Sequence, residues 1–372
     1  MSRLALYRKY RPTTFSDLIG QDIITKILQE AARQDRLAHA YLLSGPRGTG
    51  KTTTARLIAK IANCITREQN KNHKALGEPC NACPACESIN QGRAMDVIEI
   101  DAASNRGIDD IRNLQENVRI APSVLQNKVF IIDEAHQLTK EAANALLKTL
   151  EEPPANITII LATTELEKIP ATIASRTQKF QFKHVPLKLI VEKLKRIAKE
   201  EGIQAKDDAI ELIAAAGEGS FRDAESLLDQ MANMTEGEIT TEAVELTLGK
   251  LGFKKIANLT ESLLKNSLNE TLSILGEIAD EGQNLAELTK NLILHIRKIA
   301  VLAKNPSFKS KFEMELPGDQ IKIIEEQSKL FKDAHLELLK NLIKAYGQMR
   351  YSQFPQIPLE IAIIESLNKQ NV

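Results

Sequence analysis

The segment from Gly45 to Thr52 has the residue types and spacing of a phosphate-binding loop. It reads GPRGTGKT, fits the pattern G-x-x-x-x-G-K-[ST], and lies between an apolar run and a helical segment, as this motif requires. Glycines let backbone N–H groups curl around phosphate oxygens, while Lys51 can reach the β and γ phosphates and the Thr52 hydroxyl can bind Mg²⁺. The alternative, a glycine-rich turn that precedes a lysine by chance, does not explain both flanking elements. The predicted nucleotide-binding loop comprises Gly45, Pro46, Arg47, Gly48, Thr49, Gly50, Lys51, Thr52 and Thr53.

The apolar run that begins at Val129, VFIIDE, ends in two carboxylates, Asp133 and Glu134. A buried strand of this kind delivers its last side chains to the edge of the sheet where a phosphate loop lies. We expect Asp133 to hold Mg²⁺ and Glu134 to orient and polarise the attacking water. A solvated acidic turn after a core strand is the alternative, and the upstream phosphate loop disfavours it.

Cys64, Cys80, Cys83 and Cys86 are the cysteines of the chain, and the last three form two consecutive C-x-x-C steps. Four thiolates at this spacing can surround one tetrahedral Zn²⁺, and no open coordination position is offered, so a structural zinc module over about residues 64–90 is expected. Unrelated free thiols and a redox C-x-x-C are the alternatives. His73, in the long segment before Cys80, could compete as a ligand.

Short apolar runs alternate with helical segments up to KFQFKHV (Lys179 to Val185), and the pattern is helical from Pro186 onward. Alternation of this kind indicates an α/β fold with a parallel sheet covered by helices on both faces. Two helical blocks should follow. The second contains an apolar helix face formed by Leu285, Leu288, Leu292, Ile296 and Ile299.

The composition excludes several classes of protein. The 372 residues carry zero formal net charge, 43% are hydrophobic and 26% are charged, which is ordinary for a soluble globular protein. Any nucleic-acid contact would therefore need a local basic patch. No secretory signal and no apolar run free of charges is found, so we expect a cytoplasmic protein without membrane contact and cysteines that are not disulfides.

Taken in order, these motifs resemble the γ/τ motor subunits of the bacterial DNA polymerase III clamp loader, a family of AAA+ ATPases. The resemblance covers nearly the whole chain, and YRKYRPTTFSDLIGQ, HAYLLSGPRGTGKTT, VFIIDEAHQLTKEAANALLKTLEEPP and LATTELEKIPATIASRTQKFQF carry it. It implies an AAA+ P-loop domain over 1–182 with the zinc-binding insertion, a small helical lid domain over 183–247, and a helical collar domain over 248–372 that holds a ring together.

The resemblance also implies roles for single residues. Thr163, at the end of the run ITIILATT, would contact the γ-phosphate or the attacking water, and Arg222, just after the predicted N-cap Ser220, would be the sensor-2 arginine of its own subunit. Arg176 would be an arginine finger that enters the ATP site of a neighbouring subunit, although Thr177 replaces the cysteine that follows it in the family. Without the resemblance, a strand-end threonine and surface arginines would be the default interpretations.

Further implied contacts concern the base and the template strand. The residues implied at the adenine and ribose are Tyr7, Tyr10, Arg11, Pro12 and Ile19. The candidates for DNA backbone contact are Asn105, Arg106 and Arg112, in and after the loop DAASNRG. Contacts of that kind position the backbone and carry little sequence readout.

The function implied by the resemblance is ATP-driven loading of the sliding β clamp onto primed DNA. The implied partners are the δ and δ′ subunits, further copies of this chain, the β clamp and primer-template DNA. Because the sequence ends where the family's collar ends, polymerase binding is not expected.

Three other functions fit parts of the sequence. A different AAA+ machine, such as a branch-migration motor, does not explain the four cysteines. A catalytically silent scaffold like δ′ predicts a damaged phosphate loop or a missing Glu134, and both are intact. A solitary ATP-dependent DNA-binding protein leaves Arg176 without a γ-phosphate to contact.

Overall fold

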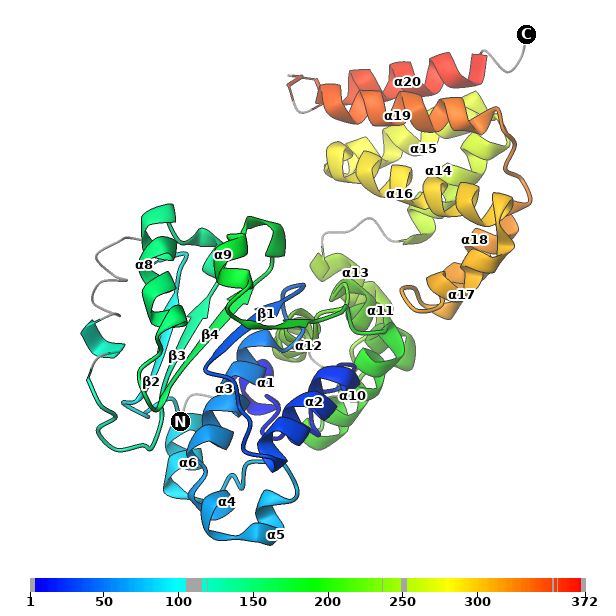
Figure 1. Cartoon of the computed structure of the whole chain (residues 1–372). Helices are drawn as coiled ribbons and strands as arrows, with labels where there is room; N and C mark the ends of the chain where they lie inside the picture. The colour runs from blue at the N-terminus through cyan, green and yellow to red at the C-terminus, as the bar shows by residue number, and fades with distance from the viewer. Residues whose placement is uncertain are drawn as a thin grey trace. The chain divides into compact units, whose positions relative to one another are not determined.

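A computed structural model of the chain describes residues 4–104, 116–118, 120–235, 237–248, 253–349, 351–352 and 354–368. The chain divides into two compact units (Figure 1). One unit consists of Met1–Ile190 together with Gly217–Ser226, and the other of Val191–Ala216 together with Leu227–Val372. The first unit therefore contains the phosphate loop, both predicted carboxylates, the cysteines and Arg222.

A parallel sheet forms the centre of the first unit, as predicted. In the described part of the chain its strands have the order β2-β3-β4-β1-β5, and every neighbouring pair is parallel. The strands are β1 (Ala40–Ser44), β2 (Val97–Asp101), β3 (Lys128–Asp133), β4 (Ile157–Thr163) and β5 (Gln178–Gln181). Ser44 pairs with Thr163, and Asp101 pairs with Asp133. The ends of these strands therefore meet at one edge of the sheet, where the side chains predicted to act on phosphate begin.

Helices cover both faces of the sheet (Figure 1). Alternate strand residues pack on one side against α8 (Lys140–Glu151) and α9 (Ala171–Ala174). On the other side they pack against α2 (Asp22–Arg33) and α3 (Lys51–Asn63). All residues of β1 and β4 are buried, which explains why these strands are continuous apolar runs rather than alternating ones.

Short helices make up much of the rest of the first unit among its described residues. They are α1 (Leu6–Lys9), α4 (Ile65–Gln69), α5 (Lys71–Lys74), α6 (Pro84–Asn90), η1 (Ala135–Gln137), η2 (Leu166–Lys168) and the first turns of α10 (Leu187–Glu201) and α12 (Phe221–Met234). The run KFQFKHV forms a strand only as far as Gln181. Two residues further on, the Lys183 amide donates to the Gln21 side chain at 3.3 Å instead of to a neighbouring strand.

The second unit is helical, as predicted for the chain after Pro186. Its further helices are α11 (Asp207–Ala216), α13 (Thr241–Leu248), α14 (Phe253–Leu264), α15 (Leu268–Asp280), α16 (Leu285–Lys304), η3 (Pro306–Phe308), α17 (Lys309–Phe312), α18 (Gly318–Ser328), α19 (His335–Met349) and α20 (Gln356–Asn368). The predicted apolar face of α16 is buried at four positions and partly buried at Leu285, in a core shared with α14, α15, α19 and α20. Within the described ranges, no helix is both long and apolar enough to cross a bilayer.

A buried histidine makes the second unit sensitive to acid. The His295 ring, 5% exposed, donates through Nε2 to Gln327 Oε1 at 2.7 Å, and Gln327 in turn donates to the Ala257 carbonyl. Burial lowers the pKa of His295 to about 4, and nearby Lys298 acts in the same direction. The folded protein therefore contains His295 as the neutral ring. The contribution of this ring to the free energy of unfolding is full above pH 6.5 and declines as the pH falls toward 4.

We expect proton uptake by His295 on unfolding to reduce the free energy of unfolding by about 2 kcal/mol between pH 7 and pH 5. Urea unfolding across this range would measure the slope. The His295→Gln variant, which cannot gain a proton but keeps an amide donor for Gln327, should show a flatter dependence. An identical slope in both proteins would contradict the assignment.

Candidate nucleotide site and cysteine cluster

The phosphate loop connects β1 to the first turn of α3. Its first amide, from Gly45, donates to the Thr163 carbonyl at 3.1 Å, which fixes the loop to the end of β4. Gly45, Gly48 and Gly50 all have positive φ, at 139°, 71° and 107°. A Cβ atom at Gly45 would lie 2.4 Å from the Phe182 carbonyl oxygen, so only glycine fits there. The loop therefore connects a strand to a helix N-terminus, as the motif requires, and its role in phosphate binding stays a prediction.

Lys51 is folded over this loop. Its side chain is buried, and Nζ donates to the carbonyls of Gly45 and Pro46 at 2.8 Å each. Burial lowers the pKa of Lys51, while the charges of Asp133 and Glu134 oppose this effect. Phosphate oxygens could replace the two carbonyls as acceptors, and they would also compensate the buried charge.

A hydroxyl and a carboxylate that are distant in sequence meet beside the loop. Thr52 Oγ1 donates to Asp133 Oδ2 at 2.7 Å, and the Glu134 amide donates to Asp133 Oδ1 at 2.9 Å. Hard oxygen atoms of this kind, combined with phosphate oxygens and water, are the ligands that Mg²⁺ prefers. The residues present therefore fit a Mg²⁺–nucleotide complex, as predicted from Thr52 and Asp133.

Glu134 has an unusual backbone conformation. Its φ is 49°, in the left-handed region that is uncommon outside glycine and that clusters at functional sites. The carboxylate accepts a hydrogen bond from Thr164 Oγ1 at 3.2 Å and lies 3.5 Å from His136 Nδ1. Its side chain remains about one-third exposed, at 34%, so water can reach it.

Arg222 and the N-terminal stretch (residues 4–19) lie against the loop from another side. Ser220 accepts the Asp223 amide at 3.2 Å, which confirms it as the N-cap of α12. A Cβ atom at Gly48 would lie 1.8 Å from Ser220 Oγ and 3.4 Å from Arg222 Cβ. The Arg222 guanidinium sits 5.1 Å from the centre of the Tyr7 ring. The structure therefore places Arg222 beside Gly48, and Tyr7 against Arg222; both were predicted to contact the nucleotide.

The other N-terminal candidates, Tyr10, Arg11, Pro12 and Ile19, are partly buried in the same stretch. Burial lowers the pKa of Arg11, and the nearby Arg56 has the same effect. Their roles toward a base stay predictions.

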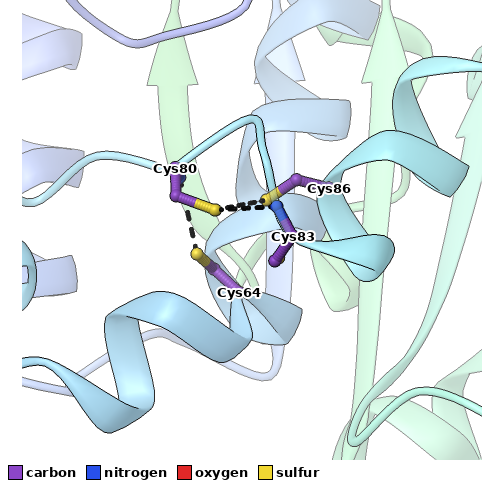
Figure 2. Close-up of side chains that lie close together, drawn as sticks. All are labelled: Cys64, Cys80, Cys83 and Cys86. Atoms are coloured by element: carbon purple, nitrogen blue, oxygen red, sulfur yellow. Dashed lines mark hydrogen bonds between the residues drawn. The ribbon is translucent and has the colours of Figure 1, made fainter.

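The four cysteines converge between the end of α3 and α6 (Figure 2). Their sulfur atoms all lie within 4.8 Å of one another, and those of Cys80 and Cys86 are 3.9 Å apart. Sulfurs bound to one zinc at about 2.3 Å in a tetrahedron would be about 3.8 Å apart. The predicted convergence is confirmed, and the four thiols fit a zinc ion. His73 is not part of this group.

The surroundings of the cluster favour thiolates. The Cys80 amide donates to Cys64 Sγ at 3.4 Å, and the amides of Ala82 and Cys83 donate to Cys80 Sγ. Hydrogen bonds from the Cys86 thiol and the Cys80 amide lower the pKa of Cys64 to about 4, and donation to Cys64 raises the pKa of Cys86. A bound metal would replace the shared proton, because the thiolate is the form that ligates.

Comparison with known proteins agrees with these features. The family model described as "DNA polymerase III, delta subunit" matches residues 20–186, and that described as "DNA polymerase III clamp loader subunit, ATPase lid domain" matches residues 189–237. DNA polymerase III subunit tau of Bacillus subtilis is 40% identical over 365 residues, covering 98% of this chain and 63% of that protein. The chain belongs to the DNA polymerase III gamma/tau family.

Other gamma/tau relatives match at similar identity. DNA polymerase III subunit tau of Escherichia coli is 40% identical over 307 residues, covering 82% of this chain and 47% of that protein. The chain thus spans about half to three-fifths of the length of these relatives. The solved RuvB Holliday junction branch migration motor of Thermotoga maritima aligns at 23% identity with a TM-score of 0.46, covering 72% of this chain and 85% of that one. Because this TM-score is below 0.5, the structural match adds nothing to the family assignment, which depends on the sequence matches alone.

His136 lies in the candidate nucleotide site, and the sequence analysis missed it. Its Nδ1 lies 3.0 Å from Thr163 Oγ1, and its Nε2 lies 3.1 Å from Glu165 Oε1. The Glu165 amide donates to Thr163 Oγ1 at 3.0 Å, so the Thr163 hydroxyl is free to donate its own proton to His136 Nδ1. In that tautomer His136 carries its proton on Nε2 and donates it to the Glu165 carboxylate. The histidine follows Glu134 by two residues, and this closeness to a predicted catalytic carboxylate was the available signal.

Arg176 lies outside this group. In the described part of the chain its side chain donates to the Thr172 carbonyl at 2.9 Å and to Ser175, and it pairs with Glu151 at 2.7 Å. Arg176 therefore forms a surface ion pair, as expected of an arginine considered without the family resemblance. Its role in a neighbouring subunit stays a prediction. The three candidates for DNA contact, Asn105, Arg106 and Arg112, lie outside the described residues.

We expect the purified chain to contain about one zinc per molecule, because a preformed four-thiol site binds zinc with an apparent free energy of roughly 10 kcal/mol or more. Elemental analysis after dialysis against a mild chelator would measure this content. The Cys86→Ser variant should lose the zinc, whereas His73→Ala should keep it. Zinc-free wild-type protein, or equal loss from His73→Ala, would contradict the four-cysteine assignment.

Proposed function

We propose that this chain is an ATP-hydrolysing motor subunit of the DNA polymerase III clamp loader. Together with δ and δ′ subunits and further copies of itself, it would open the β sliding clamp and load it onto primer-template DNA. The observation that carries this proposal is the convergence of Lys51, Thr52, Asp133 and Glu134 at one sheet edge, in a chain of the gamma/tau family.

The geometry supports a division of work in ATP hydrolysis. Lys51 would exchange its two carbonyl acceptors for phosphate oxygens, and Thr52 and Asp133 would hold Mg²⁺, which supplies positive charge against the phosphates. Glu134 would orient and polarise the attacking water. Thr163 and Arg222 would act on the γ-phosphate from the end of β4 and the start of α12.

Two further assignments belong to this proposal. Tyr7, Tyr10, Arg11, Pro12 and Ile19 would border the adenine and ribose, which the position of Tyr7 beneath Arg222 supports. The four cysteines would hold a structural zinc, which the convergence of their sulfur atoms supports. DNA contact is proposed from the family resemblance alone.

Arg176 would complete the site of a neighbouring subunit. Two observations support this: the Arg176 side chain is partly exposed, at 36%, and its partners among the described residues are Glu151, Thr172 and Ser175 rather than the phosphate loop. An exposed ion pair of this kind stabilises a fold by only about 0–1 kcal/mol, so exchange for a phosphate partner would cost little.

The test of the proposed function is steady-state ATP hydrolysis by the chain mixed with δ, δ′ and the β clamp, with and without primed DNA. Strong stimulation only when all components are present would support a clamp-loader motor. A rate indifferent to clamp and DNA would leave a P-loop ATPase with different partners, such as a branch-migration motor or a solitary DNA-binding protein.

A further inference from the structure

We propose that the cysteine module (residues 64–90) positions the N-terminal stretch of the nucleotide site, with Glu78 as the positioning residue at their junction. The inference rests on the proposed function, because it assigns the module a task in nucleotide binding. It goes beyond a structural zinc, because it says which part of the site the module holds in place.

Glu78 is the main contact between the two segments. Its Oε2 accepts the Phe15 amide at 2.7 Å, and its Oε1 accepts the Ser16 amide at 2.9 Å and the Ser16 hydroxyl at 2.8 Å. Oε1 also accepts from Gln29 of α2 at 2.7 Å. One carboxylate therefore orders the backbone of the N-terminal stretch and ties it to α2, and hydrogen bonds to a charged acceptor are among the stronger ones.

Two further contacts hold the module against the same stretch and helix. Lys60, buried on α3 one turn before Cys64, donates to the Thr13 carbonyl at 2.6 Å and to Asn81 and Asn90 of the module at 2.7 and 2.9 Å. Gly77 packs so closely on α2 that a Cβ atom there would lie 2.5 Å from the Gln29 carbonyl oxygen. The cysteine module thus contacts the N-terminal stretch through Glu78, and Lys60 bonds to both the stretch and the module.

Residues of the N-terminal stretch that follow or precede the Glu78 contacts pack directly against the phosphate loop and Arg222. Phe15 is fully buried beneath α3, and Leu18 packs against Gly50, where a Cβ atom would lie 3.4 Å from Leu18 Cδ2. Earlier in the stretch, Tyr7 stacks with Arg222 beside Gly48. A shift at Phe15 and Ser16 would therefore move the wall of the site beside the loop, while the loop itself stays fixed by Thr163.

The test uses the Glu78→Gln variant of the whole chain. Glutamine has nearly the same shape, but it has one acceptor oxygen where the carboxylate has two, so an amide group would face a backbone donor. The matched control is Glu87→Gln, which changes an exposed carboxylate on α6 of the same module. Calorimetric titration would give the affinities for ADP and for tripolyphosphate, which fits the phosphate loop but has no nucleoside.

We expect ADP to bind about tenfold more weakly to Glu78→Gln, with tripolyphosphate binding changed by less than about twofold and zinc content unchanged. Hydrogen exchange at the Phe15 and Ser16 amides should accelerate. Ser16→Ala, which removes only the hydroxyl bond, should weaken ADP binding in the same direction by about two- to threefold. Glu87→Gln should match the wild type in every measurement.

Other outcomes would overturn the inference. Faster exchange at Phe15 and Ser16 with unchanged ADP affinity would show that the module stabilises the stretch without positioning the nucleotide site. Equal losses for ADP and tripolyphosphate would indicate a general loosening of the fold. A wild-type chain that binds neither molecule would remove the proposed function itself, and the inference with it.

Discussion

Glu134→Gln should reduce ATP turnover by roughly 10²–10⁴-fold while ATP still binds. Under the proposed function this carboxylate would take up proton density from water, and its position directly after Asp133 and its one-third exposure suit that role. Glutamine can keep the hydrogen bond from Thr164 at 3.2 Å, but it cannot act as a base. Because Lys51, Thr52 and Asp133 are unchanged, the affinity for ATP should change little.

Single-turnover hydrolysis and equilibrium binding of ATP would separate these two effects. The matched control is Glu167→Gln, which alters an exposed carboxylate in η2 close to the same strand end. A variant at Glu134 that hydrolyses ATP at the wild-type rate would show that another group activates water, and His136 would then be the first candidate because it lies 3.5 Å from Glu134.

Arg176→Ala should reduce the clamp- and DNA-stimulated ATPase rate of the assembled loader by roughly 10³-fold or more, because an arginine at a γ-phosphate stabilises the charge that develops during transfer. ATP binding by the separate chain should be unaffected, since the Arg176 side chain bonds to Glu151, Thr172 and Ser175 and not to the phosphate loop of its own chain. Steady-state hydrolysis with all partners present would measure the effect.

The control for Arg176 is Glu151→Gln, which breaks the same ion pair from its other side. If the arginine served only its own fold, both variants would lose the same small amount of activity and stability. Mixing chains gives a second check. A chain with Arg176→Ala and an intact Lys51 should regain hydrolysis when a Lys51→Ala chain supplies the arginine next to it. Failure of this mixture to recover any rate would contradict a role in a neighbouring subunit.

Much of the first unit could be predicted because its signals are local. β1, β3 and β4 are apolar runs buried on both faces, so they were identifiable as strands of a covered parallel sheet. Parallel strands share one carboxyl edge, which is why Thr52, in the segment after β1, and Asp133, at the end of β3, could be placed together. The cysteine cluster was predictable from spacing too, because two consecutive C-x-x-C steps keep three thiols within one short segment that can close around a common centre.

Other parts could not be predicted because they depend on contacts between distant segments. Glu78 meets Phe15 and Ser16 across more than sixty residues, and nothing in its spacing distinguishes it from the other exposed-looking acids of the module. Lys60 has the position of an ordinary helical lysine, yet it is buried because three oxygen atoms from three segments surround it. The partners of Arg176 likewise depend on how α8 and α9 pack.

The most direct test of the central claim is clamp loading itself. A labelled β clamp would be incubated with primed circular DNA, the chain, δ and δ′, and the clamp that stays on the DNA would be measured by gel filtration. Our account predicts that the clamp elutes with the DNA only when ATP is present, and that Glu134→Gln greatly slows the release of the closed clamp. Clamp that fails to reach the DNA with ATP and every component present would contradict the account.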